Sequence, residues 1–207
     1  TLIVAPIITH RNWVNEISTY TKIDLSRVGI LEGTKKQRCE ILAKQFISGD
    51  KRVAIVNYES LAVMPELVEG IVLWAPTVVV ADECHKVKDA TTKTSKALCR
   101  IGDQAKYRYG LTGTPILRSP MDIFGQWRFL DKGKAFGSNF FMFRAMYFYD
   151  KNAGMPKQNH FPNWQPRPRA VAEIEEIMSP VSAVAKKEDV LDLPPLLKVP
   201  VEVELNK

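Results

Sequence analysis

The sequence predicts an α/β fold in which helices cover both faces of a parallel sheet. Short apolar runs alternate along the chain with amphipathic stretches, and this rhythm of strand, helix and strand is typical of such a sheet. The chain has 207 residues, of which 45% are hydrophobic, so it is long enough to bury a sizeable core.

Four apolar runs are predicted to be the strands. Each is short and unbroken, as expected for a strand that is buried on both faces of a parallel sheet. They are residues 1–5, 52–57, 77–81 and 107–112.

The segments between the runs are predicted to be crossover helices. Segment 10–20 places Trp13, Ile17 and Tyr20 on one helical face, and Trp13 is expected to pack in the core. Segment 35–49 is expected to end with Gly49 as its C-cap. A third helix over 91–102 has Thr91 or Thr92 as its N-cap. Three basic residues that open the second helix are expected to form a solvated face: Lys35, Lys36 and Arg38.

The composition of the sequence changes after Pro120. Segments 121–130 and 138–150 are rich in aromatic residues and are predicted to be helices that pack on each other or on the sheet. Residues 150–170 hold several prolines without clear periodicity, which predicts an irregular loop. A short helix and an alternating, strand-like pattern are then predicted over 171–178 and 191–205.

The composition limits the class of protein. The formal charge of +6 suits a polyanionic partner without identifying one, and a mildly basic surface is the alternative. No run approaches the roughly 18 apolar residues of a membrane helix, and no signal peptide is recognisable, so we expect a cytoplasmic or DNA-associated location without membrane contact.

The cysteines, three in number and widely spaced, argue against a disulfide framework. The chain begins inside an apolar run without Met, and we expect it to be part of a longer protein.

Charged residues follow the run 77–81 directly. Ligands of open parallel sheets bind at the carboxyl ends of strands, where Asp82, Glu83 and His85 are expected to lie. Asp82 could hold Mg²⁺ directly or through water, Glu83 could orient or deprotonate a water, and His85 could sense a phosphate. Two alternatives are a simple strand cap and a zinc site that includes Cys84, but no partner pair with metal-site spacing is present.

A second polar element ends the next strand. Thr112, Gly113 and Thr114 precede a proline, and glycine allows close backbone approach while the hydroxyls can bridge to a neighbouring histidine or carboxylate. By itself this element is only a turn.

The ordered set of motifs resembles the first RecA-like lobe of superfamily-two helicases, in the Swi/Snf-type branch of double-stranded-DNA translocases. The motifs, in chain order, are "LIVAPIITHRNWVNEI", "AIVNYESL", "VVVADECHKVKD", "YRYGLTGTP", "DIFGQWRFLDKGKAFGSNFFMFRAMY" and "KKEDVLDLPP". The third is similar to the DEAH variant, with Cys84 in the alanine position. Each motif alone is weak, whereas the ordered set is specific.

The resemblance implies a role for each site residue. Asp82 helps to hold Mg²⁺ through water, Glu83 positions or activates the attacking water of ATP hydrolysis, and His85 couples to Thr112 and Thr114. Residues near the backbone of the tracking DNA strand are expected to be Pro6, Asn57 and Tyr58.

The resemblance also implies parts that these residues do not contain. The lysine-bearing phosphate loop and the adenine-recognition region are expected upstream of Thr1, and a second RecA-like lobe of the same parent chain downstream. The family commonly continues TGTP with a polar asparagine, where this chain reads "ILRSP", and Arg118 receives no role. The predicted organisation is a partial RecA-like lobe, a helical and irregular extension, and a linker or strand, over 1–130, 131–192 and 193–207.

The predicted function is therefore that of a fragment of an ATP-dependent translocase on duplex DNA, inactive in isolation. The alternatives are a motor-derived clamp that has lost turnover, and a lobe of an RNA or single-stranded-DNA helicase. Trp164, Arg167 and Arg169 could grip nucleic acid, although a solvated insertion is the preferred interpretation. No oligomeric state is predicted.

Overall fold

A computed structural model shows the arrangement of the chain. The chain divides into two compact units, Thr1–Val171 and Ala172–Lys207, and each is described by itself. Residues whose structure is described are 1–114, 116, 119–156 and 160–185.

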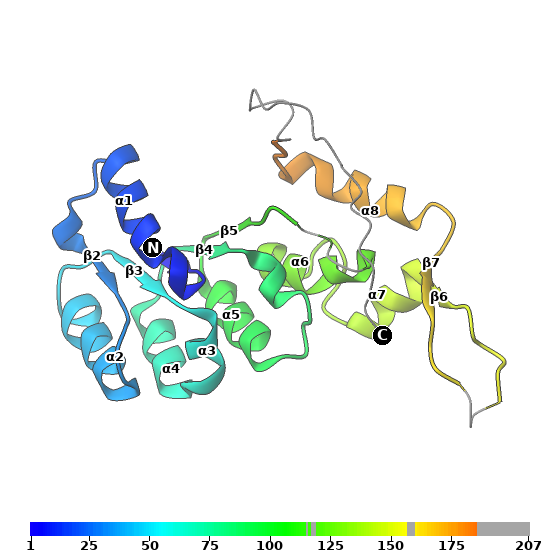
Figure 1. Ribbon diagram of the computed structural model, residues 1–207, viewed down its shortest axis with the longest axis horizontal. Coiled ribbons are helices and arrows are strands. Elements are labelled where there is room, and N and C mark those ends of the chain that lie inside the picture. The colour runs from blue at the N-terminus through cyan, green and yellow to red at the C-terminus, as the bar shows by residue number, and fades with distance from the viewer. Residues whose placement is uncertain (115, 117–118, 157–159, 186–207) are drawn as a thin grey trace, which may run out of the picture. The chain divides into compact units, whose positions relative to one another are not determined.

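The first unit is built on a five-stranded parallel sheet with strand order β2-β3-β1-β4-β5 (Figure 1). This architecture confirms the predicted α/β class. Four strands coincide with predicted runs: β1 (Leu2–Val4), β3 (Val53–Val56), β4 (Val78–Asp82) and β5 (Tyr107–Leu111). The edge strand β2 (Val28–Ile30) was not predicted, because three residues around Gly29 carry too weak a strand signal.

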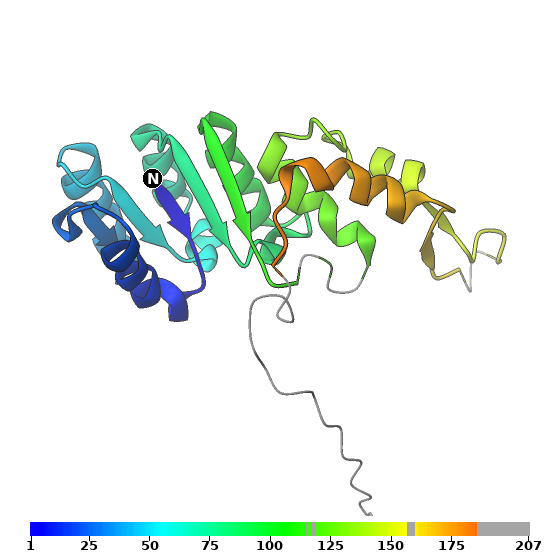
Figure 2. The same ribbon diagram turned by 90° about the horizontal axis from the view of Figure 1, so that it is seen from above.

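One face of the sheet is covered by the helices that connect its strands, except for α1 (Figure 2). The pair α3 and α4 was not predicted, because the sequence that follows β3 was interpreted only as a motif. Thr92 is the N-cap of α5 and its side chain accepts a hydrogen bond from the backbone of Ser95, which confirms one of the two predicted caps. The helices are α2 (Lys35–Ile41), a π-helical turn (Leu42–Ile47), α3 (Tyr58–Val63), α4 (Pro65–Trp74) and α5 (Lys93–Gln104).

Gly49 is not the cap of the second predicted helix, which corrects that expectation. The helical segment ends at Ile47, and Ser48 is its C-cap in the right-handed region. Glycine is required for another reason: a Cβ atom at Gly49 would lie 2.6 Å from the carbonyl oxygen of Gln45.

Helix α1 (His10–Tyr20) lies on the other face, where it covers β1, β2 and β3. Ile17 is buried and Trp13 packs partly against the same core, but Tyr20 is 78% exposed, so the prediction that all three share the buried face was wrong for Tyr20. Three side chains at alternate positions of β5 are about half exposed: Tyr107, Tyr109 and Leu111.

The aromatic segments form α6 (Ile123–Asp131) and α7 (Phe140–Tyr147), as predicted. Phe124 of α6 stacks on Phe143 of α7, with ring centroids 5.1 Å apart. The following residues are not wholly irregular, because β6 (Phe148–Asp150) pairs antiparallel with β7 (Trp164–Pro166). The prediction of an irregular loop over 150–170 was therefore wrong at β7.

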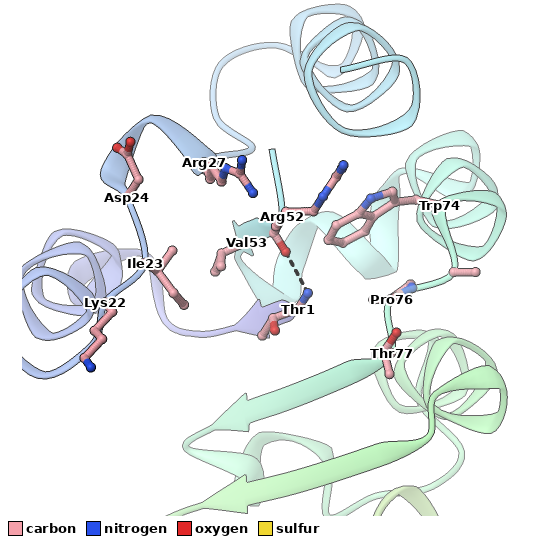
Figure 3. Close-up of a pocket in the computed structure, with 11 residues that line it drawn as sticks. Thr1, Lys22, Ile23, Asp24, Arg27, Arg52, Val53, Trp74, Pro76 and Thr77 are labelled. Carbon is pink, nitrogen blue, oxygen red and sulfur yellow. Dashed lines mark hydrogen bonds between the residues drawn. The ribbon is translucent and has the colours of Figure 1, made fainter. Parts of the chain in front are cut away.

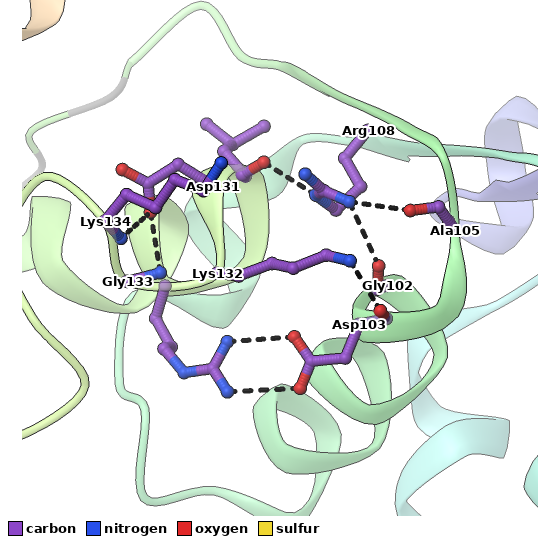
Figure 4. Close-up of polar contacts among 10 residues, drawn as sticks. Gly102, Asp103, Ala105, Arg108, Asp131, Lys132, Gly133 and Lys134 are labelled. Carbon is purple, nitrogen blue, oxygen red and sulfur yellow. Dashed lines mark hydrogen bonds and ion pairs between the residues drawn. The ribbon is translucent and has the colours of Figure 1, made fainter.

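Arginine side chains join α6 to the sheet (Figure 4). Arg108 on β5 donates to the carbonyl oxygens of Leu130 and Ala105 at 2.7 and 2.8 Å. Arg128 forms a bidentate ion pair with Asp103, with both N···O distances at 3.1 Å. These contacts fix α6 against α5 and against the amino-terminal part of β5.

The second unit contains most of α8 (Ala170–Met178), which confirms the predicted short helix. The "KKEDVLDLPP" motif, the strand-like pattern within 191–205 and the linker 193–207 lie outside the described residues, as does Arg118. Among the residues that the structure describes, no helix is long and apolar enough to cross a membrane.

Candidate functional site

The candidate site lies at the carboxyl end of β4. Asp82 is the last residue of that strand, and Glu83 turns sharply out of it with φ 53° and ψ 51°. A left-handed conformation is uncommon for a residue with a side chain and costs roughly 1–3 kcal/mol. The strain places Glu83 at the start of a tight 3-10 turn (Cys84–Val87), so that His85 comes back beside it.

His85, Glu83 and Thr112 form a close group across β4 and β5. The Nδ1 atom of His85 lies 3.1 Å from Glu83 Oε2 and 3.1 Å from Thr112 Oγ1. The Thr112 hydroxyl also lies 3.4 Å from the same Glu83 oxygen. Thr114 joins the group through its backbone N–H, which donates to Thr112 Oγ1 at 3.1 Å. Glu83, His85 and Thr112 are therefore together, with Thr114 bonded to Thr112 and not shown in contact with His85. At Gly113, nothing lies within 4 Å of a Cβ atom built there.

The carboxylate of Asp82 is held from α1 and the turn before it. Its Oδ2 atom accepts hydrogen bonds from the indole Nε1–H of Trp13 at 3.0 Å and from the Thr9 hydroxyl at 3.3 Å. The Tyr58 hydroxyl donates to the backbone carbonyl of Asp82 at 2.7 Å. Trp13 thus packs in the core as predicted and also contacts the site, a role that sequence spacing alone did not reveal.

The carboxylates of Asp82 and Glu83 suit a magnesium ion whose remaining ligands are water and phosphate oxygens. Among the described residues, no hydrogen bond is made by Asp82 Oδ1, and Glu83 is about two-fifths exposed. No group of three or more histidine, cysteine, aspartate or glutamate side chains suited to a metal is found in the described part of the chain. Mg²⁺ commonly binds to one or two carboxylates and completes its shell with water and phosphate oxygens. The arrangement suits that mode, and it does not suit a four-ligand zinc site.

Cys84 is part of the packing between the turn and α6. Its side chain is 3% exposed and its thiol donates to Gln126 Oε1 at 3.2 Å. Burial raises the pKa of the Cys84 thiol to about 12, with the Glu83 carboxylate as a further cause. The buried thiol is already bonded to Gln126, and this contact speaks against the zinc alternative.

The residues predicted to lie near DNA are placed differently from one another. Pro6 is partly exposed and directly precedes the turn Ile7–Thr9. In that turn, the Ile7 side chain is 66% exposed and the Ile8 side chain is 82% exposed. Asn57 and Tyr58 are 8% and 2% exposed. Burial raises the pKa of the Tyr58 hydroxyl, which bonds to the candidate site as described above.

Arg38 supports this region and is not part of a solvated face, which corrects that prediction. Its guanidinium donates to Asn57 Oδ1 and Ser60 Oγ, each at 2.7 Å. Asn57 Nδ2 in turn donates to Glu59 Oε2 at 2.8 Å, and this bond lowers the pKa of the Glu59 carboxyl. Lys35 and Lys36 are exposed as predicted.

A cavity of about 690 Å³ lies at the opposite, amino-terminal edge of the strands (Figure 3). Arg27 and Arg52 line it beside the Trp74 indole. None of the predicted site residues takes part in it.

Comparisons with known proteins identify the fold and the family. A solved structure, "Sulfolobus solfataricus SWI2/SNF2 ATPase core in complex with dsDNA", superposes with a TM-score of 0.66, at 24% identity, over 94% of this chain and 36% of that one. This likeness shows the fold. "Putative protein p41" of Acyrthosiphon pisum secondary endosymbiont phage 1 is 26% identical over 99% of this chain and 44% of its own length.

A similar relative in yeast is much longer than this chain. "ISWI chromatin-remodeling complex ATPase ISW1" of Saccharomyces cerevisiae is 29% identical over 62% of this chain, which spans 11% of that protein. The chain thus spans less than half the length of these relatives. The SNF2-related domain family matches residues 1–207, and the protein therefore belongs to the family of SNF2-related domains.

Proposed function

We propose that this chain is the first motor lobe of an ATP-hydrolysing translocase that moves on duplex DNA. The observation that carries the proposal is the grouping of Glu83, His85 and Thr112 across the ends of two adjacent strands. A carboxylate in this position can accept a proton from water. Because it contacts both a histidine and the next strand, a change in its charge can alter the position of those neighbours.

Each residue of the site has a distinct task in this proposal. Asp82 holds Mg²⁺ through water, and the ion supplies neutralisation of phosphate charge when it is bound. Glu83 positions the attacking water and accepts its proton. His85 couples protonation of Glu83 to the position of Thr112, since its Nδ1 atom contacts both side chains.

The rest of the ATP site is expected from other parts of the protein. A phosphate loop with its lysine is absent from the 207 residues, and this loop cradles the β- and γ-phosphates in motors of this class. We therefore expect the isolated chain to be inactive, and the intact protein to bind ATP and Mg²⁺ between this lobe and a second RecA-like lobe.

The proposed track is duplex DNA, and the protein is expected to be DNA-associated in the cell. The similar Sulfolobus solfataricus core was solved in complex with double-stranded DNA. The turn Ile7–Thr9 is exposed at Ile7 and Ile8, where backbone N–H groups could bind phosphate without reading sequence. A clamp without turnover, or a motor on RNA or single-stranded DNA, is the alternative.

ATP turnover by the intact protein distinguishes these functions. It is measured without nucleic acid and with duplex DNA, single-stranded DNA or RNA at equal phosphate concentration. The proposal predicts stimulation by duplex DNA, with an affinity that falls steeply as salt rises because phosphate contacts release counterions. Stimulation by RNA alone would change the track, and absence of turnover on every track would favour the clamp.

A further inference from the structure

The Asp82 carboxylate is bonded from two consecutive pieces of the chain that lead away from β1. Thr9 belongs to the turn that follows Pro6, and Trp13 belongs to the first turn of α1. Both side chains place a donor within hydrogen-bonding distance of the same oxygen, Oδ2. We propose that Thr9 and Trp13 are positioning residues that transmit contact of DNA with the Pro6–Thr9 turn to the metal-binding carboxylate. The inference rests on the proposed function.

Trp13 is the rigid part of this connection. Its indole packs partly against the core under α1, a core that includes buried Ile17 and Ile3. The Nε1–H is the only hydrogen-bond donor of an indole, and it is directed at Asp82 Oδ2 at 3.0 Å. A displacement of the first turn of α1 is therefore a displacement of the donor that orients Asp82.

Thr9 is the adjustable part. Its hydroxyl lies 2.9 Å from the carbonyl oxygen of Pro6 and 3.3 Å from Asp82 Oδ2. A hydroxyl has one proton to donate, so it serves one acceptor at a time. The Pro6 carbonyl also accepts the backbone N–H of Thr9 at 2.9 Å, and it stays satisfied when the hydroxyl turns to Asp82.

The turn that holds Thr9 is accessible to a large ligand. Ile7 and Ile8 are mostly exposed, and Arg11 in the next turn is exposed too. A duplex that rests its phosphates on this turn can press the backbone of Thr9 toward β4. The bond from Thr9 to Asp82 then shortens, Oδ2 is fixed by two donors, and Oδ1 is left for the metal.

The connection predicts a specific effect of a nearly isosteric substitution. Thr9→Val removes the hydroxyl and keeps the branched shape, so the turn can fold without its bond to Asp82. Hydrogen bonds to charged groups contribute enough that we expect duplex DNA to tighten metal binding about tenfold less in this variant than in the wild type. Thr19→Val is the matched control, because Thr19 lies in α1, the helix that follows the turn, and its hydroxyl bonds to the carbonyl oxygen of Asn15.

Two measurements on the intact protein test the inference independently of turnover. The first is Mn²⁺ binding followed by electron paramagnetic resonance, with ADP present, with and without duplex DNA. The second is ¹⁹F NMR of protein labelled with 5-fluorotryptophan, in which the Trp13 signal is assigned by its loss in Trp13→Phe. We expect duplex DNA to tighten Mn²⁺ binding and to shift the Trp13 signal, and Thr9→Val, but not Thr19→Val, to reduce both effects.

The outcomes separate this inference from the proposed function. If duplex DNA stimulates ATP turnover, but Thr9→Val matches Thr19→Val in Mn²⁺ binding and in the Trp13 signal, the connection is refuted and the motor remains. If Mn²⁺ binding and the Trp13 signal respond to DNA through Thr9 while no ATP is hydrolysed, the connection stands and the motor function is refuted.

Discussion

His85 Nδ1 lies 3.1 Å from Thr112 Oγ1, so a side-chain contact of His85 joins the turn after β4 to the residue that follows β5. Among the described residues, Thr114 is joined to this contact through its backbone N–H, which donates to Thr112 Oγ1. The two threonines of the second motif are therefore unequal in the structure, although their sequence positions gave them the same role.

Thr112→Val should uncouple ATP use from movement more than Thr114→Ala does. The valine cannot bond to His85 or Glu83, whereas the alanine keeps the N–H that bonds to Thr112. We expect Thr112→Val to retain ATP binding and to lower the distance moved per ATP by about tenfold, the effect of losing one bond to a charged group. Translocation and turnover are measured together on one duplex. Equal effects of the two variants would contradict the ranking.

Cys84 should resist thiol reagents while the protein is folded. Its raised pKa of about 12 leaves little thiolate near neutral pH, and its side chain is buried. Alkylation by iodoacetamide at pH 8, followed by mass spectrometry, should label Cys84 only after denaturant is added. Rapid labelling of Cys84 in the native protein would show that the turn after β4 is not packed against Gln126 as described.

The stability of the fold should decrease as pH falls below about 6.5, in part because of His10. Burial lowers the pKa of His10 in the folded protein, and nearby Arg38 lowers it further, although the hydrogen bond to the Ala5 carbonyl opposes this. The unfolded chain then binds a proton more readily than the folded chain, so the stabilisation is complete above the unfolded pKa and is lost as pH falls toward the folded value.

Urea unfolding at pH 7.5 and 5.5 measures the contribution of His10 to the free energy of unfolding. His10→Gln keeps a donor for Ala5 but does not titrate, so its loss of stability between the two pH values should be smaller than that of the wild type. An identical loss in both proteins would remove His10 from the pH dependence.

The stacking of Arg144 on Trp164 should hold the β6–β7 pair against α7. The guanidinium lies 4.0 Å from the centre of the Trp164 ring and also faces Phe141. Arg144→Ala should destabilise this region by about 1 kcal/mol, and Arg144→Lys by less, because a lysine keeps the charge without the planar stack. Hydrogen exchange of the β6 and β7 amides measures the effect. Trp164 is thereby an internal contact, and only its remaining surface is available to nucleic acid.

Much of the fold and the site could be predicted because the signals are local. The apolar runs of β1, β3, β4 and β5 are continuous, and polar residues at their ends meet where parallel strands end together. Strand β2 was missed because three residues give no periodicity. The bonds from Trp13 to Asp82 and from Arg38 to Asn57 cross 69 and 19 positions of the chain. Such contacts depend on how the helices dock, which spacing along a single helix does not reveal.

The most direct test of the account is the ATP turnover of Glu83→Gln in the intact protein with duplex DNA. The matched control is Glu66→Gln, which removes a carboxylate whose ion pair with Lys35 is exposed on α4. We predict that Glu83→Gln binds ATP normally and loses turnover by at least about 100-fold, because the water loses its base while Asp82 remains, and that the control turns over like the wild type. Undiminished turnover by Glu83→Gln would contradict the assignment of this site.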